Sequence, residues 1–184
     1  MDIGIWGDSI TYGGPNEGWV APLRKVLSSR DINVYNRGIC GDTSEDILKR
    51  FTVEKDAIEP AIIIFAVGTN DSKYPNGGKD NKISFEKFKE NMRKLIAQAK
   101  SSANRVLLIG LTPVNETTID STSKFLNSSI KQYDEYLKQL AEQEGLEFIE
   151  INSVLDLKTD LEDGIHPNAQ GYAKMFKAVL SVFK

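Results

Sequence analysis

The sequence predicts an α/β protein, a three-layer α/β/α sandwich built on a five-stranded parallel sheet. Short apolar, β-branched runs alternate with longer amphipathic segments along the whole chain, and this alternation is typical of βαβ units. The run Ala61–Val67 is apolar throughout, so both of its faces are expected to be covered, as in a central parallel strand. Polar motifs follow the expected strands. Together these observations favour an arrangement of the flavodoxin-like type.

The expected elements follow from the hydrophobic pattern. Strands are expected over five short runs: Asp2–Trp6, Asn33–Asn36, Ala61–Val67, Arg105–Leu111 and Glu147–Ile149. Helices are expected over five amphipathic segments: Gly18–Arg30, Ser44–Phe51, Ser84–Ser102, Lys124–Glu144 and Pro167–Phe183. The third and fourth helices carry stripes spaced three or four residues apart, which is the helical period: Phe85, Phe88, Met92, Leu95, Ile96 and Ala99, then Phe125, Ser129, Tyr133, Tyr136, Leu137 and Leu140. Thr43, with Asp46 three residues on, resembles a loose capping box for the second helix.

The polar motifs all fall at one edge of the predicted sheet. Right-handed crossovers in an open parallel sheet place a ligand site beyond the carboxyl ends of the strands. The first four strands are followed in order by Gly7-Asp8-Ser9, Gly41-Asp42-Thr43, Gly68-Thr69-Asn70-Asp71 and Thr112-Pro113-Val114-Asn115. Asp163 and His166 lie beyond the fifth strand. Because no repeat or linker interrupts the alternation, we expect a single domain over residues 1–184.

Composition narrows the function classes. The 184 residues are 40% hydrophobic and 27% charged, as in ordinary soluble domains. The net charge of -3 gives no reason to expect nucleic acid or an anionic membrane as partner. One cysteine, Cys40, and one histidine, His166, leave no intramolecular disulfide and no Cys/His zinc site. We expect no metal and no cofactor. Trp6 and Trp19 are interpreted as packing residues rather than substrate platforms.

Localisation is predicted from two further features. The first residues lack the basic segment and the long apolar run of a signal peptide. No apolar stretch approaches the length of a membrane span. We therefore expect a cytoplasmic protein without a membrane span, and its oligomeric state stays open.

The single histidine limits the possible chemistry. A hydroxyl nucleophile needs a general base, and at neutral pH that base is usually an imidazole. If the protein uses a serine mechanism, the base is therefore His166, and Asp163 is placed to orient the ring. The structural alternative is that His166, which Pro167 follows, simply caps the last helix.

Each polar motif also has a structural interpretation beside a chemical one. Gly7-Asp8-Ser9 fits a strand-to-loop turn in which a side chain binds local amides, and Gly41-Asp42-Thr43 fits a turn with an N-cap. Gly68-Thr69-Asn70-Asp71 follows a buried strand abruptly. An asparagine amide and glycine amides at such a place can donate hydrogen bonds to the oxyanion of an acyl-transfer intermediate.

The motifs resemble, in order and spacing, the four blocks of the SGNH hydrolases, the GDSL-type esterase and lipase family. The resemblance extends from Gly7-Asp8-Ser9 through Gly41 and Asn70 to Asp163-Gly164-Ile165-His166-Pro167, and it makes residues 1–184 an SGNH hydrolase-like catalytic domain. It implies that Ser9 is the nucleophile and that Asp163 and His166 complete a triad. It also implies an oxyanion hole formed by the amides of Ser9 and Gly41 and by the side chain of Asn70.

Two residues depart from the family pattern. Ile10 stands where the family name implies leucine, a conservative apolar change, and Cys40 precedes Gly41 where members often carry serine. We interpret Cys40 as a small packed residue. The neighbouring carboxylates Asp8 and Asp71 are expected to bind backbone amides that shape the oxyanion loop rather than to react.

The predicted function is hydrolysis of small carboxylic esters, acyl or acetyl, through an acyl-enzyme. The segments Ser72–Ile83 and Thr112–Ser123 are expected to border the site, and they contain no apolar lid, so a small soluble ester or an acetylated sugar fits better than a triglyceride. A lysophospholipase, a thioesterase, a carbohydrate acetylesterase or an acyltransferase would use the same residues. Two alternatives lie outside this class: a non-catalytic flavodoxin-like binding module, and a metal-dependent phosphohydrolase that uses the strand-end aspartates.

Overall fold

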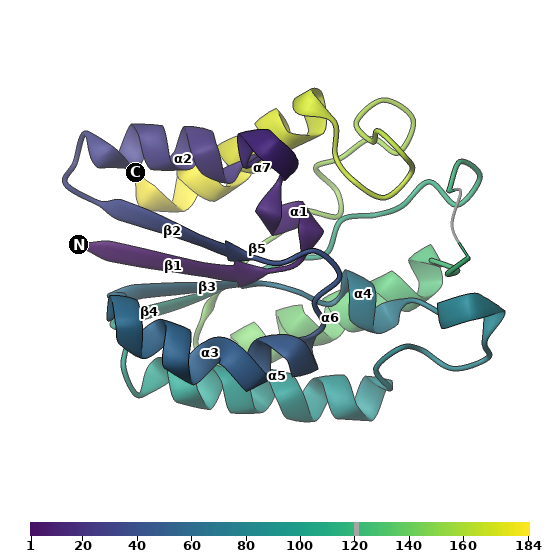
Figure 1. The fold of residues 1–184 in the computed structure, drawn as a ribbon, viewed down its shortest axis with the longest axis horizontal. Helices are drawn as coiled ribbons and strands as arrows, with labels where there is room; N and C mark the ends of the chain where they lie inside the picture. Colours follow the sequence, from purple (N-terminus) through teal and green to yellow (C-terminus); the bar gives the residue numbers. More distant parts are fainter. Residues whose placement is uncertain (120–121) are drawn as a thin grey trace.

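The five strands form one parallel sheet in the order β2-β1-β3-β4-β5 (Figure 1). In the computed structural model, which describes residues 1–119 and 122–184, their bounds are β1 Asp2–Gly7, β2 Asn33–Gly38, β3 Ile62–Ala66, β4 Arg105–Ile109 and β5 Glu147–Ile149. This is the strand order of the flavodoxin-like type. The predicted fold class is therefore confirmed.

Helices cover both faces of the sheet (Figure 1). One face carries α2 (Val20–Ser28) and α7 (Ala169–Leu180), and the other carries α3 (Ser44–Ile58), α5 (Phe85–Lys100) and α6 (Asn127–Glu144). Single turns follow two strands as α1 (Ser9–Tyr12) and α4 (Thr69–Ser72), and three short 3-10 helices occupy η1 Gly14–Asn16, η2 Pro75–Gly77 and η3 Ser181–Phe183.

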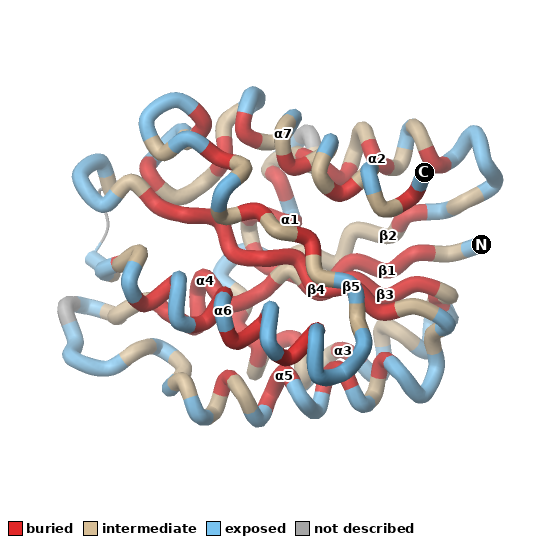
Figure 2. The backbone as a smooth tube through the Cα atoms, turned by 180° about the vertical axis from the view of Figure 1, so that it is seen from behind, coloured by how far each residue is buried: buried red, intermediate tan, exposed pale blue. Residues whose placement is uncertain are grey.

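Side chains that alternate along the central strands supply both cores. In β3, Ile63 and Phe65 pack with the α3, α5 and α6 face, whereas Ile62 and Ile64 pack with the α2 and α7 face. A strand points successive side chains to opposite faces, so a strand covered on both sides must be apolar throughout. Figure 2 shows the central strands β1, β3 and β4 as mostly buried, between helices that are exposed on their outer sides, whereas the edge strand β2 is largely of intermediate burial. Trp6 and Trp19 are fully buried, one in each core, which agrees with the packing role predicted for them.

Most predicted boundaries differ from the structure by one to three residues, and three of the differences have a clear structural reason. The hydrophobic pattern predicts the second helix over Ser44–Phe51, yet α3 runs on to Ile58. The pattern misses the last two turns because their apolar side chains do not form a buried stripe; Val53, for example, is 76% exposed. The fourth strand ends at Ile109 rather than Leu111, where Gly110 begins the exit from the sheet. The fourth helix begins at Asn127 rather than Lys124, because Lys124 forms an isolated antiparallel bridge with Tyr74.

Candidate active site

Ser9 is presented by the turn that ends β1. The Asp8 side chain caps α1 by accepting a hydrogen bond from the Ile10 amide, with Oδ1 and N 2.9 Å apart, so the helix begins at Ser9. The close approach of this turn to β3 requires glycine before it, because a Cβ at Gly7 would lie 2.6 Å from the carbonyl oxygen of Ala66. Ser9 is consequently held at the carboxyl edge of the sheet, half-buried.

His166 is positioned by a tight turn that Asp163 stabilises. One oxygen of Asp163, Oδ1, accepts the backbone amides of Ile165 and His166 at 2.9 and 2.8 Å. The other, Oδ2, lies 2.7 Å from Nδ1 of the His166 ring. Gly164 takes a left-handed φ of 86° inside the turn, which glycine adopts without strain.

The structure brings Ser9, His166 and Asp163 into one hydrogen-bonded chain. Nε2 of His166 lies 2.8 Å from Oγ of Ser9, within the hydrogen-bond reach that a general base and its nucleophile need. Partial burial acts to raise the pKa of Asp163, but hydrogen bonds from the backbone and ring of His166 outweigh it and hold that pKa below its usual value. Asp163 is therefore ionised at neutral pH and can orient the ring and stabilise its protonated form.

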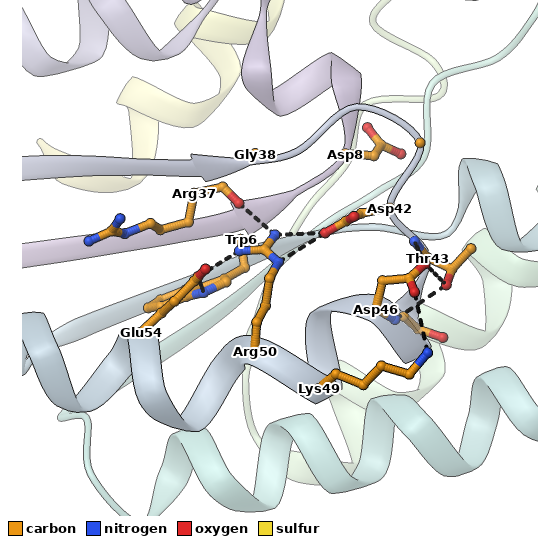
Figure 3. Close-up of polar contacts among 12 residues, drawn as sticks. Trp6, Asp8, Arg37, Gly38, Asp42, Thr43, Asp46, Lys49, Arg50 and Glu54 are labelled. Atoms are coloured by element: carbon orange, nitrogen blue, oxygen red, sulfur yellow. Dashed lines mark hydrogen bonds and ion pairs between the residues drawn. The ribbon is translucent and has the colours of Figure 1, made fainter.

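Arg50 of α3 anchors the loop that carries Gly41 by hydrogen bonds to residues on either side of it in the sequence. Figure 3 shows the Arg50 guanidinium between Asp42, Glu54 and the backbone of Arg37. Its Nε donates to Asp42 Oδ2 at 2.9 Å, and its two terminal nitrogens donate to Glu54 Oε2 at 2.6 Å and to the Arg37 carbonyl at 2.7 Å. Gly41 itself has a left-handed φ of 83°. The guanidinium thus ties the loop to both β2 and α3.

Asn70 occupies the turn after β3 and lies almost fully buried beside Asp8. Its Nδ2 donates to Asp8 Oδ2 at 3.4 Å, and its Oδ1 accepts from Lys73 Nζ at 3.1 Å. In the part of the chain that the structure describes, neither the Ser9 amide nor the Gly41 amide donates to a protein acceptor. Two backbone donors and one side-chain amide are therefore available at the same edge of the sheet.

Two cavities meet at Ser9, Cys40 and His166. The smaller, about 340 Å³, is lined by the candidate oxyanion donors Gly41 and Asn70 together with Ile10, Phe125 and other residues. The larger, about 730 Å³, is lined by residues of the segments 12–22 and 162–173. A substrate that spans Ser9 can therefore place one part in each cavity.

The chain is similar in sequence to a family of known proteins over most of its length. Residues 5–174 match the GDSL-like lipase/acylhydrolase family. The chain belongs to this family. The resemblance drawn from the sequence is thereby confirmed, as is the expectation of a carboxylic ester hydrolase at the level of the family.

Relatives within the GDSL-like family cover nearly all of the chain. A GDSL esterase/lipase from Arabidopsis thaliana is 31% identical over 199 residues, which cover 99% of this chain and 64% of that protein, so the chain spans about two thirds of its length. An acetylxylan esterase from Geobacillus stearothermophilus is 24% identical over 95% of this chain and 90% of its own. A crystal structure of an acetylxylan esterase from the same species superposes with a TM-score of 0.82 at 21% identity, covering 98% of this chain and 92% of the other.

The structure corrects two expectations about the surroundings of the site. Cys40 is not packed as predicted: it is exposed and lines both cavities, because the loop that ends β2 turns outward there. The larger cavity is bordered by the segments 12–22 and 162–173 rather than by the predicted segments 72–83 and 112–123. Of the predicted segments only Lys73 lines either cavity among the described residues. Residues 120 and 121 lie outside the described residues.

Several residues of the site have no signal in the sequence that marks them as functional. Tyr12 and Tyr172 line the larger cavity, and Lys73 and Phe125 line the smaller one. Tyr12 lies three residues after Ser9, so a one-turn helix at that point would have placed both on one side. Lys73 likewise lies three residues after Asn70, whereas Tyr172 and Phe125 reach the site only through tertiary contacts.

The strand-end aspartates have separate partners. Asp8 caps α1, Asp42 pairs with Arg50, and Asp71 accepts hydrogen bonds from the Ser44 amide and hydroxyl. Asp8 and Asp71 therefore bind backbone amides around the site, as predicted.

Two kinds of feature are absent from the described part of the chain. Within residues 1–119 and 122–184, no group of three His, Cys, Asp or Glu side chains is arranged to hold a metal ion. In the same ranges no helix is both long and apolar enough to span a membrane.

Burial of Asp71 predicts an unusual pH dependence of stability. Burial raises the pKa of Asp71 to about 7, although hydrogen bonds from Ser44 act against it, and burial raises that of Asp8 to about 6. At these two sites the folded protein binds more protons than the unfolded chain, whose aspartates titrate near pH ~4, so Asp8 and Asp71 make the free energy of unfolding fall as pH rises from about 4 to about 7. In thermal unfolding, Asp71→Asn should weaken this dependence, whereas the exposed control Asp80→Asn should keep it. A midpoint that climbs through this range in the wild type would contradict the prediction.

Proposed function

We propose that this chain is a serine esterase that hydrolyses small acyl esters through an acyl-enzyme. The observation that carries the proposal is the continuous chain of contacts from Ser9 Oγ to His166 Nε2, at 2.8 Å, and from His166 Nδ1 to Asp163 Oδ2, at 2.7 Å. A carboxylate, an imidazole and a hydroxyl in this order form a charge-stabilised base beside a nucleophile. The Ser9 end of this series of hydrogen bonds borders a cavity large enough for a substrate.

The mechanism follows from the positions of the donors and acceptors. His166 Nε2 takes the proton of Ser9 as Oγ attacks the ester carbonyl carbon. The carbonyl oxygen becomes an oxyanion, which accepts hydrogen bonds from the Ser9 and Gly41 amides and from Asn70 Nδ2. His166 then gives the proton to the leaving alcohol and later activates the water that releases the acid. Asp163 keeps the ring in the orientation that both steps need.

The solved structures support these roles. Those of the acetylxylan esterase from Geobacillus stearothermophilus include catalytic mutants in which a serine, an aspartate or a histidine is replaced by alanine. In that protein the aspartate and the histidine are separated by the same number of residues as Asp163 and His166. The two structures superpose over 98% of this chain with a TM-score of 0.82, and together with the shared spacing this similarity supports carrying the three roles over to Ser9, Asp163 and His166.

The two cavities suggest where the acyl group and the alcohol group of a substrate bind. We assign the acyl group to the smaller cavity, because the candidate oxyanion donors line it. The alcohol then occupies the larger cavity beside His166, which protonates it as it leaves. Tyr12, Tyr172 and Pro15 line this cavity, and aromatic and proline faces suit the apolar face of a sugar ring. An acetylated sugar is accordingly the substrate class that we favour, as for the relatives named acetylxylan esterases.

Acyl chain length provides a test of this assignment. Each methylene that becomes buried favours binding by about 0.8 kcal/mol, roughly fourfold per carbon, and the gain ends once the chain reaches solvent. We expect kcat/KM on p-nitrophenyl esters to peak between acetyl and butyryl and to fall for octanoyl and longer chains. Release of acetate from acetylated xylo-oligosaccharides, followed in parallel, tests the alcohol side. A steady rise in kcat/KM to long chains would contradict the small-ester assignment and favour a lipase.

A further inference from the structure

The wall of the smaller cavity contains a lysine that the proposed mechanism does not use. Lys73 is the C-cap residue that follows α4, three residues after Asn70, and it lines the cavity with Ser9 and Gly41. Its Nζ lies 3.1 Å from Asn70 Oδ1 and 5.6 Å from the centroid of the Phe125 ring. The ammonium therefore contacts the opposite end of the amide whose nitrogen is a candidate oxyanion donor.

The charge of Lys73 is not neutralised by a paired carboxylate. Within residues 1–119 and 122–184 it forms no ion pair, and its contacts are the Asn70 amide oxygen and the Phe125 ring. The charged groups whose fields act most strongly on it are Lys82 and Asp8. Lys82 in turn donates to the Gly41 carbonyl at 3.1 Å. The oxyanion side of the site thus carries two cations, Lys73 and Lys82, near the buried carboxylate of Asp8.

The contacts on either side of Asn70 fix the direction of its amide. Nδ2 faces Asp8 Oδ2 at 3.4 Å and Oδ1 faces Lys73 Nζ at 3.1 Å. Rotating the amide by half a turn would set its oxygen against the carboxylate and its NH₂ against the ammonium, and both contacts would be repulsive. One N–H is directed at Asp8, so the second N–H of Nδ2 is left for a substrate oxygen.

A cation on the amide oxygen also strengthens the amide as a donor. Hydrogen bonds that share a polarisable group reinforce one another, and charge-assisted bonds are stronger than neutral ones. When electron density is drawn toward Oδ1, the Nδ2 hydrogens become more positive. This benefit is largest where negative charge develops, which in ester hydrolysis is the tetrahedral intermediate.

We propose that Lys73 is a positioning residue, which holds and polarises the Asn70 amide so that its free N–H stabilises the oxyanion. The inference rests on the proposed function. It predicts that loss of the ammonium lowers kcat much more than it raises KM, because the ground-state carbonyl gains less from the polarised donor than the oxyanion does. It also predicts that Lys73 acts only through Asn70.

The test compares neutral, conservative and control variants on p-nitrophenyl acetate. Lys73→Met should lower kcat by roughly tenfold or more with KM changed less than threefold. Lys73→Arg, which keeps the positive charge, should retain most of the wild-type kcat. Lys79→Met removes the same charge from an exposed site on the same segment and should stay within about twofold of wild type. Lys73→Gln serves as a second neutral variant if Lys73→Met unfolds at a lower temperature.

A double-mutant cycle distinguishes action through Asn70 from a general field. In an Asn70→Ala background, Lys73→Met should have little further effect on kcat. An equal loss in both backgrounds, or a Lys73→Met rate equal to that of Lys79→Met, would overturn the inference while leaving the esterase proposal intact. Wild-type hydrolysis that survives Ser9→Ala would instead overturn the esterase proposal, and the role of Lys73 with it.

Discussion

Replacing Ser9 by alanine is expected to lower kcat on small esters by roughly 10⁵-fold or more, with little change in stability. Loss of a nucleophile or its base in a comparable hydrolase costs about 10⁶-fold, and the residual rate comes from substrate binding and the oxyanion hole. Among the described residues the Ser9 hydroxyl shares one hydrogen bond, with His166, and the side chain is small, so its removal should change the packing little. Steady-state kinetics with p-nitrophenyl acetate, together with thermal unfolding, measure both effects.

The same mechanism predicts that Ser9 and His166 act as one unit. His166→Ala should be nearly as inactive as Ser9→Ala, and the double variant should be little worse than either single one. Ser28→Ala is a matched control, because Ser28 is an exposed serine at the end of α2 and should leave kcat within about twofold. Losses that multiply in the double variant would show that the two residues act separately.

Removing the side-chain donor is expected to give the second large effect. Asn70→Ala should lower kcat by roughly 10²–10³-fold, the cost of losing one oxyanion donor in a comparable hydrolase. KM should change much less, since the interaction forms fully only in the transition state. Because Asn70 is almost fully buried, thermal unfolding must be followed in the same samples.

A control asparagine makes the result for Asn70 specific. Asn33 lies at the amino end of β2, at the opposite edge of the sheet, and is exposed. Asn33→Ala should therefore keep wild-type kcat. An Asn70→Ala enzyme that retains kcat but has a raised KM would place Asn70 in ground-state binding instead of the oxyanion hole.

The sequence predicted those features that depend on pattern and on order along the chain. An uninterrupted apolar run identified the central strand, because a strand covered on both faces has no polar side. A single imidazole left one possible base, and the carboxyl ends of parallel strands must share an edge. Ser9 and His166 could thus be expected together although 157 positions separate them.

Features that depend on tertiary contact could not be predicted. Beyond Phe51 charged residues interrupt the apolar face of α3, which resumes only at Ile58, so the hydrophobic pattern fades before the helix ends. Arg50 gave no signal, since a charged residue on a helix is usually solvated, yet it reaches across to Asp42 and the backbone of Arg37. The exposure of Cys40 depends on how the loop after β2 turns, and a local sequence does not specify that.

Covalent labelling of the intact protein tests the serine mechanism most directly. The protein is incubated with a fluorophosphonate, with and without a chelator, and the adduct is located by mass spectrometry of its peptides. We expect a single adduct on Ser9 that is insensitive to chelator, is absent from Ser9→Ala and forms far more slowly in His166→Ala. No adduct, or an adduct on another residue while Ser9 stays unmodified, would contradict the assignment of Ser9 as the nucleophile.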